Sequence, residues 1–329
     1  MIGNIVKIDE IDKKILKELD YNSRQSDSAI SKKVKTSKQV VNYRINNLIK
    51  KKLIKNFYSI INTGNIGFDS YYIFLQLENL NKEKQKNSLK KLVQNNSIGW
   101  IIEGIGKWEL IILIFARNIN EFKSNLNNIM SIYKNKISDY KFSLLVQSEH
   151  IGYNQIKKNN KEGIKQTEKK QILKLKEIET KIIKQISQNA RISIVEISEK
   201  SKLPIHVTKY HLKHLIKNKI IEGFKPKLNL NLVGIQWYLI LINLKENIEE
   251  DIKKKFLKFC KNEKEVYYLT NTIGEYDLML DIHIKKIDEL KNFIFKIKEN
   301  FPQIIKNYEL LNVFEEHKIN YFPYPISSS

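Results

Sequence analysis

The beginning of the chain places apolar residues every three to four positions in three successive segments, the spacing of helices that bury one face. The first segment covers about 8–20, the second begins after Ser26 and the third after Ser37, because serine is a favoured helix-capping residue. A strand-like run from Leu53 follows and is expected to form a wing, which completes the pattern of a winged helix-turn-helix. The buried faces are predicted at Ile8, Ile11, Ile15, Leu19, Ile30, Val34, Val41, Ile45 and Leu48.

The next residues change to alternating and continuous apolar runs, which indicate strands. Strands are predicted from Tyr71 onward, at 98–105, at 108–116 and near 138–147, with helices at 83–94 and around Phe122 to Ile129. This order, strand-helix-strand-strand-helix-strand, is the ferredoxin-like pattern. Such a sheet leaves one face uncovered, so pairing with a second sheet is expected.

The whole pattern then occurs a second time. A shift of 167 residues aligns 11–78 with 178–245 without a gap, so that Arg24 meets Arg191 and Tyr43 meets Tyr210. The second copy predicts a third helix at about Ile205–Lys217, strands at 236–244, 265–272, 277–284 and 304–314, and helices at 249–261 and 287–300. The predicted fold class is α+β, with two copies of a winged helix-turn-helix followed by a ferredoxin-like βαββαβ domain.

The repeat divides the chain into six parts. We predict winged helix-turn-helix 1 at 1–62, ferredoxin-like domain 1 at 66–153, a lysine-rich linker at 154–176, winged helix-turn-helix 2 at 177–229, ferredoxin-like domain 2 at 233–318 and a tail at 319–329. The linker is expected to become helical before the second copy, and the tail is expected to be irregular.

The net charge of +22 is unevenly distributed along the chain. Residues 1–60 hold 14 Lys and Arg against 6 Asp and Glu, and residues 161–225 hold 16 against 7. Residues 226–329 hold 15 of each. Since clustered positive charge is the footprint of a phosphate-backbone partner, the helix-turn-helix parts are predicted to bind double-stranded DNA.

The outward face of each third helix supplies the candidate DNA contacts, because that helix enters the major groove in helix-turn-helix proteins. Asparagine and glutamine can pair with adenine, whereas lysine and arginine serve guanine or phosphate. The first copy offers a mixture suited to reading bases, and the second a more basic surface in which Pro204 replaces Ser37 and His211 replaces Arg44. The candidates are Ser37, Lys38, Gln39, Asn42, Arg44, Asn46, Lys50, His206, Lys209, His211, Lys213 and Lys217.

Several other classes of protein are not expected. No run of 18 apolar residues predicts a membrane span, and the start lacks the pattern of a signal peptide. The single cysteine, Cys260, fits a reducing cytoplasm, where we expect the protein to act. His211 and His214 lie one helical turn apart without a third ligand nearby in the sequence, so no metal site is predicted. We expect no cofactor and no catalytic centre.

These motifs resemble those of the leucine-responsive regulatory protein (Lrp/AsnC) family of transcription regulators, present twice. The resemblance covers about 8–150 and 176–318, although family members usually have one copy per chain. It implies a sheet domain that dimerises and often binds amino acids. The residues that carry it are Asp12-x-x-Ile15-Leu16, Asn22-Ser-Arg24, Ser37-x-x-x-Val41-x-x-Arg44-Ile45-x-x-Leu48, Leu53-Ile54, Ile66-Gly67, Asn189-Ala-Arg191 and Ile273-Gly-Glu-Tyr-Asp277.

The resemblance also implies an effector site at the family's glycine-aspartate turn. That turn maps to Gly274, Tyr276 and Asp277 in the second copy. In the first copy it maps to Gly106, Trp108 and Glu109, where Trp and Glu depart from the pattern and leave ligand binding open.

Two other functions fit the same architecture. The siroheme decarboxylases, which are enzymes, also use this module in pairs, and their chemistry requires a deep pocket with His and Tyr donors between sheets. The strands expected to supply those donors, 98–105 and 265–272, contain no histidine, although Tyr267 and Tyr268 are present. The lysine excess also suits an architectural DNA-binding protein that tolerates any sequence.

Overall fold

Both copies begin with the three predicted helices. The computed structural model describes residues 5–78, 81–154, 164–166 and 172–324. The predicted serine caps are confirmed, because Ser26 Oγ accepts the N–H of Ala29 and Ser37 Oγ accepts the N–H of Val40. The helices are α1 (Glu10–Tyr21), α2 (Asp27–Val34) and α3 (Lys38–Lys50) in the first unit, and α6 (Glu177–Gln188), α7 (Ile194–Ser201) and α8 (Ile205–Lys217) in the second.

The strand that follows each three-helix unit pairs with its counterpart from the other copy. β1 (Ile54–Ile61) runs antiparallel to β7 (Ile221–Leu228), and Tyr58 lies opposite Lys225, its own equivalent in the repeat. Two equivalent residues face each other only across a twofold axis, so this ribbon marks the pseudo-twofold axis of the chain. The prediction of a wing strand is therefore confirmed, but its partner comes from the other copy.

Each ferredoxin-like domain forms as predicted, with four strands and two helices. The first contains β2 (Asp69–Leu77), α4 (Lys82–Gln94), β3 (Ile98–Ile105), β4 (Leu110–Ala116), α5 (Ile119–Tyr133) and β5 (Ile137–His150). The second contains β8 (Gln236–Leu244), α9 (Glu250–Asn262), β9 (Val266–Gly274), β10 (Leu278–Ile284), α10 (Ile287–Asn300) and β11 (Ile305–Ile319). Short 3₁₀ turns lie at Gly64–Ile66, Lys134–Lys136 and Leu230–Val233.

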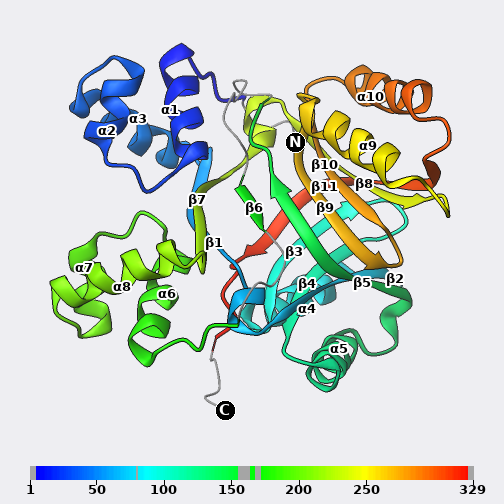
Figure 1. The fold of residues 1–329 in the computed structure, drawn as a ribbon, viewed down its shortest axis with the longest axis horizontal. Coiled ribbons are helices and arrows are strands. Elements are labelled where there is room, and N and C mark those ends of the chain that lie inside the picture. The colour runs from blue at the N-terminus through cyan, green and yellow to red at the C-terminus, as the bar shows by residue number, and fades with distance from the viewer. Residues whose placement is uncertain (1–4, 79–80, 155–163, 167–171, 325–329) are drawn as a thin grey trace.

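The two sheets pair within the chain at both edges. β5 pairs with β9, and β11 pairs with β3, so the order β2-β4-β3-β11-β8-β10-β9-β5 returns to β2 and closes a barrel. The expected face-to-face pairing thus becomes a closed barrel, in which each of these strands has a neighbouring strand on both sides. Figure 1 shows the two three-helix units on one side, joined by the β1–β7 ribbon, and the barrel with its helices on the other.

Two glycines allow the sheets to close on each other. A Cβ at Gly106 would lie 2.6 Å from the carbonyl oxygen of Leu310 on β11, and one at Gly274 would lie 2.6 Å from that of Phe142 on β5. These distances are far below a van der Waals contact, so a side chain at either position would push the crossing strand away. Gly106 and Gly274 thus lie at the seam of the barrel, which is the pair of edges where β3 meets β11 and β9 meets β5.

The apolar residues form one inner and two outer cores. Phe256, Phe293 and their neighbours fill the space between α9, α10 and the outer face of the second sheet, and a similar set lies under α4 and α5. The inner core continues from the barrel into both three-helix units. No helix among the described residues is long and apolar enough to cross a membrane.

The linker differs from its prediction, whereas residues 320–324 of the tail are irregular as expected. Ile164–Gln166 form a short strand, β6, that pairs with β5, and residues 172–176 have no helical structure before α6 begins at Glu177. The expected linker helix is thus wrong at 172–176, and residues 164–166 pair with the edge of β5 instead of forming a helix. Residues 155–163 and 167–171 of the linker, and 325–329 of the tail, lie outside the described residues. Phe322 in the tail is buried in the inner core.

Candidate nucleic-acid interface and central cavity

Both third helices present a polar surface. In α3, Val41, Ile45 and Leu48 face the core and hold the helix against its unit, as predicted. In α8, Thr208, Leu212 and Leu215 do the same. Ten of the twelve predicted DNA contacts are exposed: Ser37, Lys38, Gln39, Asn42, Asn46, Lys50, His206, Lys209, Lys213 and Lys217.

The other two predicted contacts, Arg44 and His211, are engaged inside their units. Arg44 forms ion pairs of 2.6 Å with Asp9 and 3.0 Å with Asp12, which raise its pKa and tie α3 to the start of α1. His211 is 8% exposed, and its Nδ1 lies 3.2 Å from Oε1 of Glu179. His211 therefore lacks the exposure that a phosphate contact needs. Arg44 and His211 occupy equivalent positions in the two copies, and each binds a carboxylate of the first helix of its own unit or the residues that precede it.

The sequence reasoning did not include two exposed aromatic residues on these helices. Tyr43 on α3 is 71% exposed, and its equivalent Tyr210 on α8 is 66% exposed. Large side chains this exposed on both copies of one helix face are candidates for contacts with a partner. Their recurrence after 167 residues, at a position outside the buried stripe, was the signal that could have identified them.

The two three-helix units hold each other through one arginine from each. The guanidinium of Arg24 donates to the carbonyl oxygens of Ala190 and Ile192, both at 2.7 Å. Arg191 donates in the same way to Ser23 at 2.6 Å and to Gln25 at 3.1 Å. The Asn-x-Arg segments that carry the family resemblance thus fix the relative position of α3 and α8.

Arg191 makes one more contact that has no equivalent in the other unit. Its Nη2 lies 2.7 Å from Oδ1 of Asp27, whose Oδ2 accepts a 2.8 Å hydrogen bond from Asn42 on α3. Ile194 takes the place of Asp27 in the second copy. The exposed amide of Asn42 is therefore positioned by a contact between the units, and the two surfaces are not equivalent.

The predicted effector turns contribute mainly to the barrel. Trp108 and Tyr276 are each 1% exposed, and the indole N–H of Trp108 donates to the hydroxyl of Tyr276 at 2.6 Å across the pseudo-twofold axis. Glu109 and Asp277 accept the backbone N–H groups of Leu77 and Leu244. Burial between the sheets withdraws the two aromatic side chains from an external ligand. Gly106 and Gly274 are exposed and lie at the seam.

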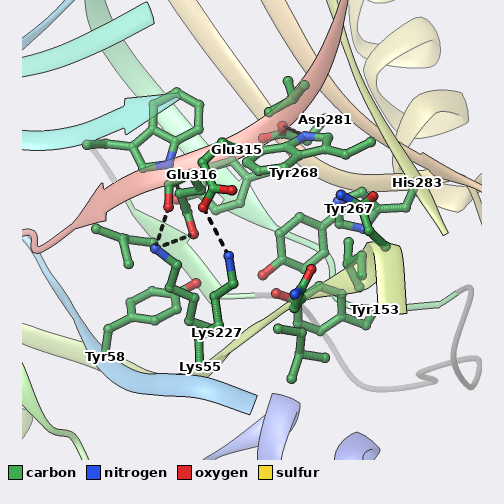
Figure 2. Close-up of a pocket in the computed structure, with 18 of the residues that line it drawn as sticks. Lys55, Tyr58, Tyr153, Lys227, Tyr267, Tyr268, Asp281, His283, Glu315 and Glu316 are labelled. Atoms are coloured by element: carbon green, nitrogen blue, oxygen red, sulfur yellow. Dashed lines mark hydrogen bonds and ion pairs between the residues drawn. The ribbon is translucent and has the colours of Figure 1, made fainter. Parts of the chain in front are cut away.

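A polar cavity of about 80 Å³ lies where the ribbon meets the mouth of the barrel. Its walls come from both strands of the ribbon, from barrel strands of both copies and from the segment after β11 (Figure 2). Many of the side chains are aromatic, and they include Tyr72, Trp100, Trp237, Tyr267, Tyr268 and Tyr321. The sequence reasoning looked for histidine on 98–105 and 265–272, but the histidine here, His283, comes from β10.

The charged groups of the cavity are mostly paired. Lys55 on β1 lies 3.1 Å from Glu315, and Lys227 on β7 lies 3.1 Å from Glu316 (Figure 2). Asp281 on β10 accepts the indole N–H of Trp237 at 2.6 Å, and burial raises its pKa to about 7. Burial also lowers the pKa of His283 to about 3, so the imidazole is neutral at physiological pH.

Comparison with known proteins identifies both helix-turn-helix units. The family model described as winged helix-turn-helix DNA-binding, HTH_24, matches residues 8–55 and 175–222. The HTH-type transcriptional regulator FL11 of Pyrococcus furiosus is 26% identical over 121 residues, which cover 36% of this chain and 78% of FL11. The structure of AsnC from E. coli covers 43% of this chain and 93% of its own, with 17% identity and a TM-score of 0.35.

One solved structure is similar over nearly the whole chain. The siroheme decarboxylase NirDL superposes with a TM-score of 0.62 and 16% identity, covering 96% of this chain and 94% of its own. The same enzyme in complex with an iron-uroporphyrin III analogue gives a TM-score of 0.61. At this identity the likeness shows the fold alone.

Proposed function

We propose that this chain is a tandem Lrp/AsnC-like protein and acts as a sequence-specific DNA-binding transcription regulator. The observation that supports the proposal most is the pair of exposed polar faces on α3 and α8, held in fixed relation by Arg24 and Arg191. Positive charge gathers in the same two units. The protein thus has, in one chain, the two reading units that helix-turn-helix dimers obtain by association.

The fixed relation between the units gives a direct test. Half-sites read from one face of DNA lie about one helical turn, or a multiple of it, apart. Inserting five base pairs between half-sites turns one of them to the opposite face, so binding in a gel-shift assay should weaken sharply. Placing the five extra base pairs outside the two half-sites is the control, because it lengthens the duplex and leaves the spacing of the half-sites unchanged. Equal affinity for the original and the five-base-pair duplex would refute a paired reading mode.

The same assay separates a regulator from an architectural protein. Scrambled competitor DNA should displace the protein poorly from a promoter fragment if bases are read. Competition by scrambled DNA at the same concentration as by the promoter fragment would support sequence-tolerant packaging of DNA.

We further propose that the two copies divide the work. Asn42 on α3 carries an amide suited to a base edge, whereas Lys213 on α8 is an exposed cation suited to phosphate. Asn42→Ala should relax the preference at one base pair, at a cost of about 1–3 kcal/mol if the contact is bidentate. Lys213→Ala should weaken cognate and scrambled duplexes alike at fixed salt. If the lysine variant loses discrimination and the asparagine variant keeps it, the assignment is reversed.

We also propose that a small effector binds at the glycine turns, at fewer residues than the sequence suggested. Since Trp108 and Tyr276 are buried, the exposed parts of these turns are Gly106, Gly274 and their flanking backbone. Titrating an amino-acid panel while following the backbone amide signals of these glycines by NMR tests it. Shifts confined to other residues would exclude this location.

A siroheme decarboxylase-like activity is the second candidate, favoured by the full-length likeness to NirDL and by a polar cavity at the barrel mouth. Two features of the cavity weigh against it. Its 80 Å³ volume is below the roughly 300–1,000 Å³ of pockets that enclose drug-sized ligands. Its unpaired charge is the carboxylate Asp281, which would repel the carboxylates of siroheme. Absorbance near 400 nm in the purified protein, retained through gel filtration, would favour the enzyme.

A further inference from the structure

The central cavity combines an aromatic wall with hydrogen-bond acceptors. The indole rings of Trp100 and Trp237 have centroids 6.2 Å apart, and Tyr72 lies edge-on to Trp100 at 6.1 Å. Tyr268 and Tyr321 complete this wall. The faces of such rings carry partial negative charge, so they attract a cation that has lost its water.

Two groups in the cavity can accept hydrogen bonds from a ligand. Asp281 is partly exposed and lines the cavity, and the indole N–H of Trp237 donates to its Oδ1. His283 lines the same space and is 3% exposed, and its Nδ1 has no partner among the described residues. A buried polar atom without a partner is costly, so a ligand that donates a hydrogen bond to Nδ1 would remove this cost.

The balance of charge decides the sign of that ligand. Lys55 and Lys227 are each paired with a glutamate, Glu315 and Glu316. Trp100 donates a further hydrogen bond to Glu316 at 2.7 Å. With His283 neutral, Asp281 is the charge of the cavity that no cation offsets. An anion would meet this carboxylate and the negative ring faces, whereas a cation would be attracted by both.

We propose that this cavity binds a small aliphatic primary amine in its ammonium form. The ammonium group donates to Asp281 and to His283, and its alkyl part packs on the indole rings. A volume of about 80 Å³ corresponds to two or three water molecules at roughly 30 Å³ each, which suits a ligand of about three to five non-hydrogen atoms. A tetrapyrrole is too large and has charge of the wrong sign.

The charge of Asp281 makes the binding depend on pH. The titratable groups that interact with this carboxylate are Glu316 on β11, which is itself paired with Lys227 on β7, and the hydroxyls of Tyr72 and Tyr268. The pKa values of these hydroxyls are raised by burial, so they stay neutral below pH 10. Since the pKa of Asp281 is about 7, about a tenth of it is charged at pH 6 and nearly all of it at pH 8 to 9.

The test is a titration of the full chain, without DNA, with three probes of equal size. Propylamine, propan-1-ol and propionate present a cation, a neutral group and an anion on the same alkyl chain. Calorimetry and the fluorescence of Trp100 and Trp237 report binding. We expect propylamine to bind at least tenfold more tightly than either other probe, and about tenfold more tightly at pH 8 than at pH 6.

Asp281→Asn keeps the acceptor for the indole of Trp237 and removes the charge. It should weaken propylamine at least tenfold and abolish the pH dependence, whereas Asp288→Asn, on the exposed start of α10, should change neither. Far-UV circular dichroism establishes that both variants are folded. Absence of propylamine binding, a preference for propionate, or unchanged affinity in Asp281→Asn would each overturn the proposal, as would stoichiometric binding of a tetrapyrrole that excludes propylamine.

This site is independent of the proposed function. The titrations contain no DNA, so their failure leaves DNA binding untouched, and failure of the gel shifts leaves the amine site untouched.

Discussion

The buried ion pair between Asp20 on α1 and Lys225 on β7 joins the first three-helix unit to the ribbon. Both side chains are 3% exposed, and Nζ lies 3.3 Å from Oδ1. Oδ2 of Asp20 also accepts the backbone N–H of Tyr153. Burial lowers the pKa of Lys225, although the aspartate opposes this effect. We predict that Lys225→Met strongly destabilises the protein, because it leaves Asp20 buried without a counter-charge.

The expected loss in the free energy of unfolding depends on the hydrogen bond that Asp20 keeps in Lys225→Met. Removing one member of a buried pair typically costs about 3–5 kcal/mol. The remaining hydrogen bond from Tyr153 to a charged acceptor offsets part of this, so a loss of about 3 kcal/mol is expected. The double variant Asp20→Asn/Lys225→Met removes both charges and keeps an acceptor for that N–H. It should recover most of the loss, since neutral replacements of buried pairs are often near neutral.

Urea unfolding measures both variants. The fluorescence of Trp100, Trp108 and Trp237 reports the barrel, and far-UV circular dichroism also reports the helices of the two units. In Lys225→Met the dichroism should change at lower urea than the fluorescence, because the first unit loses its attachment. A loss below about 1 kcal/mol for Lys225→Met, or a double variant no more stable than the single one, would refute this reasoning.

The remaining predictions concern the seam, the units and their charge. Gly274→Ala should lower the melting temperature far more than Gly234→Ala. Both glycines have a positive φ, but a Cβ at Gly274 meets backbone atoms, whereas a Cβ at Gly234 meets nothing within 4 Å. Equal shifts in melting temperature would contradict the steric argument. Burial raises the pKa of Glu222 to about 7, whereas the pKa of an unfolded glutamate is roughly 4.3. The contribution of Glu222 to stability is therefore fully present below roughly pH 4.3 and is lost as the pH rises to about 7. Glu222→Gln should therefore flatten the stability profile between pH 4.5 and 7.5, and an unchanged profile would exclude Glu222 as its source. Arg191→Ala should reduce DNA affinity more than Arg24→Ala, because only Arg191 reaches the residue that positions Asn42; gel shifts with the reverse order would contradict this. The affinity for DNA should fall steeply with salt, by about 0.9 in log units per phosphate contact for each log unit of salt, and a flat dependence would argue against a phosphate partner.

The helices and strands were largely predictable because their signals are local. The spacing of Val41, Ile45 and Leu48 and the caps at Ser26 and Ser37 specify helices without reference to the rest of the chain. Partners were harder to predict. The apolar run from Ile54 identifies a strand, but nothing in it states that the neighbour is the equivalent strand 167 residues later.

The candidate site shows the same limit. An outward position on α3 follows from periodicity, so the exposure of Asn42 and Lys38 was predictable. The ion pairs of Arg44 and the burial of His211 depend on residues 32 and more positions away, which periodicity does not report. The cavity was not predictable at all, since its walls come from both copies and from the ribbon.

The closed barrel has a consequence for how this protein can evolve. In a homodimer every substitution occurs in both subunits, so a DNA site that a homodimer binds stays palindromic. Here the two halves are separate parts of one sequence, so a substitution can change one half alone. Asp27 in the first copy and Ile194 at the equivalent position of the second are an example. One half can therefore drift towards an unrelated sequence while the other keeps its target. Since both halves of the barrel belong to one chain, the two three-helix units also stay together on dilution.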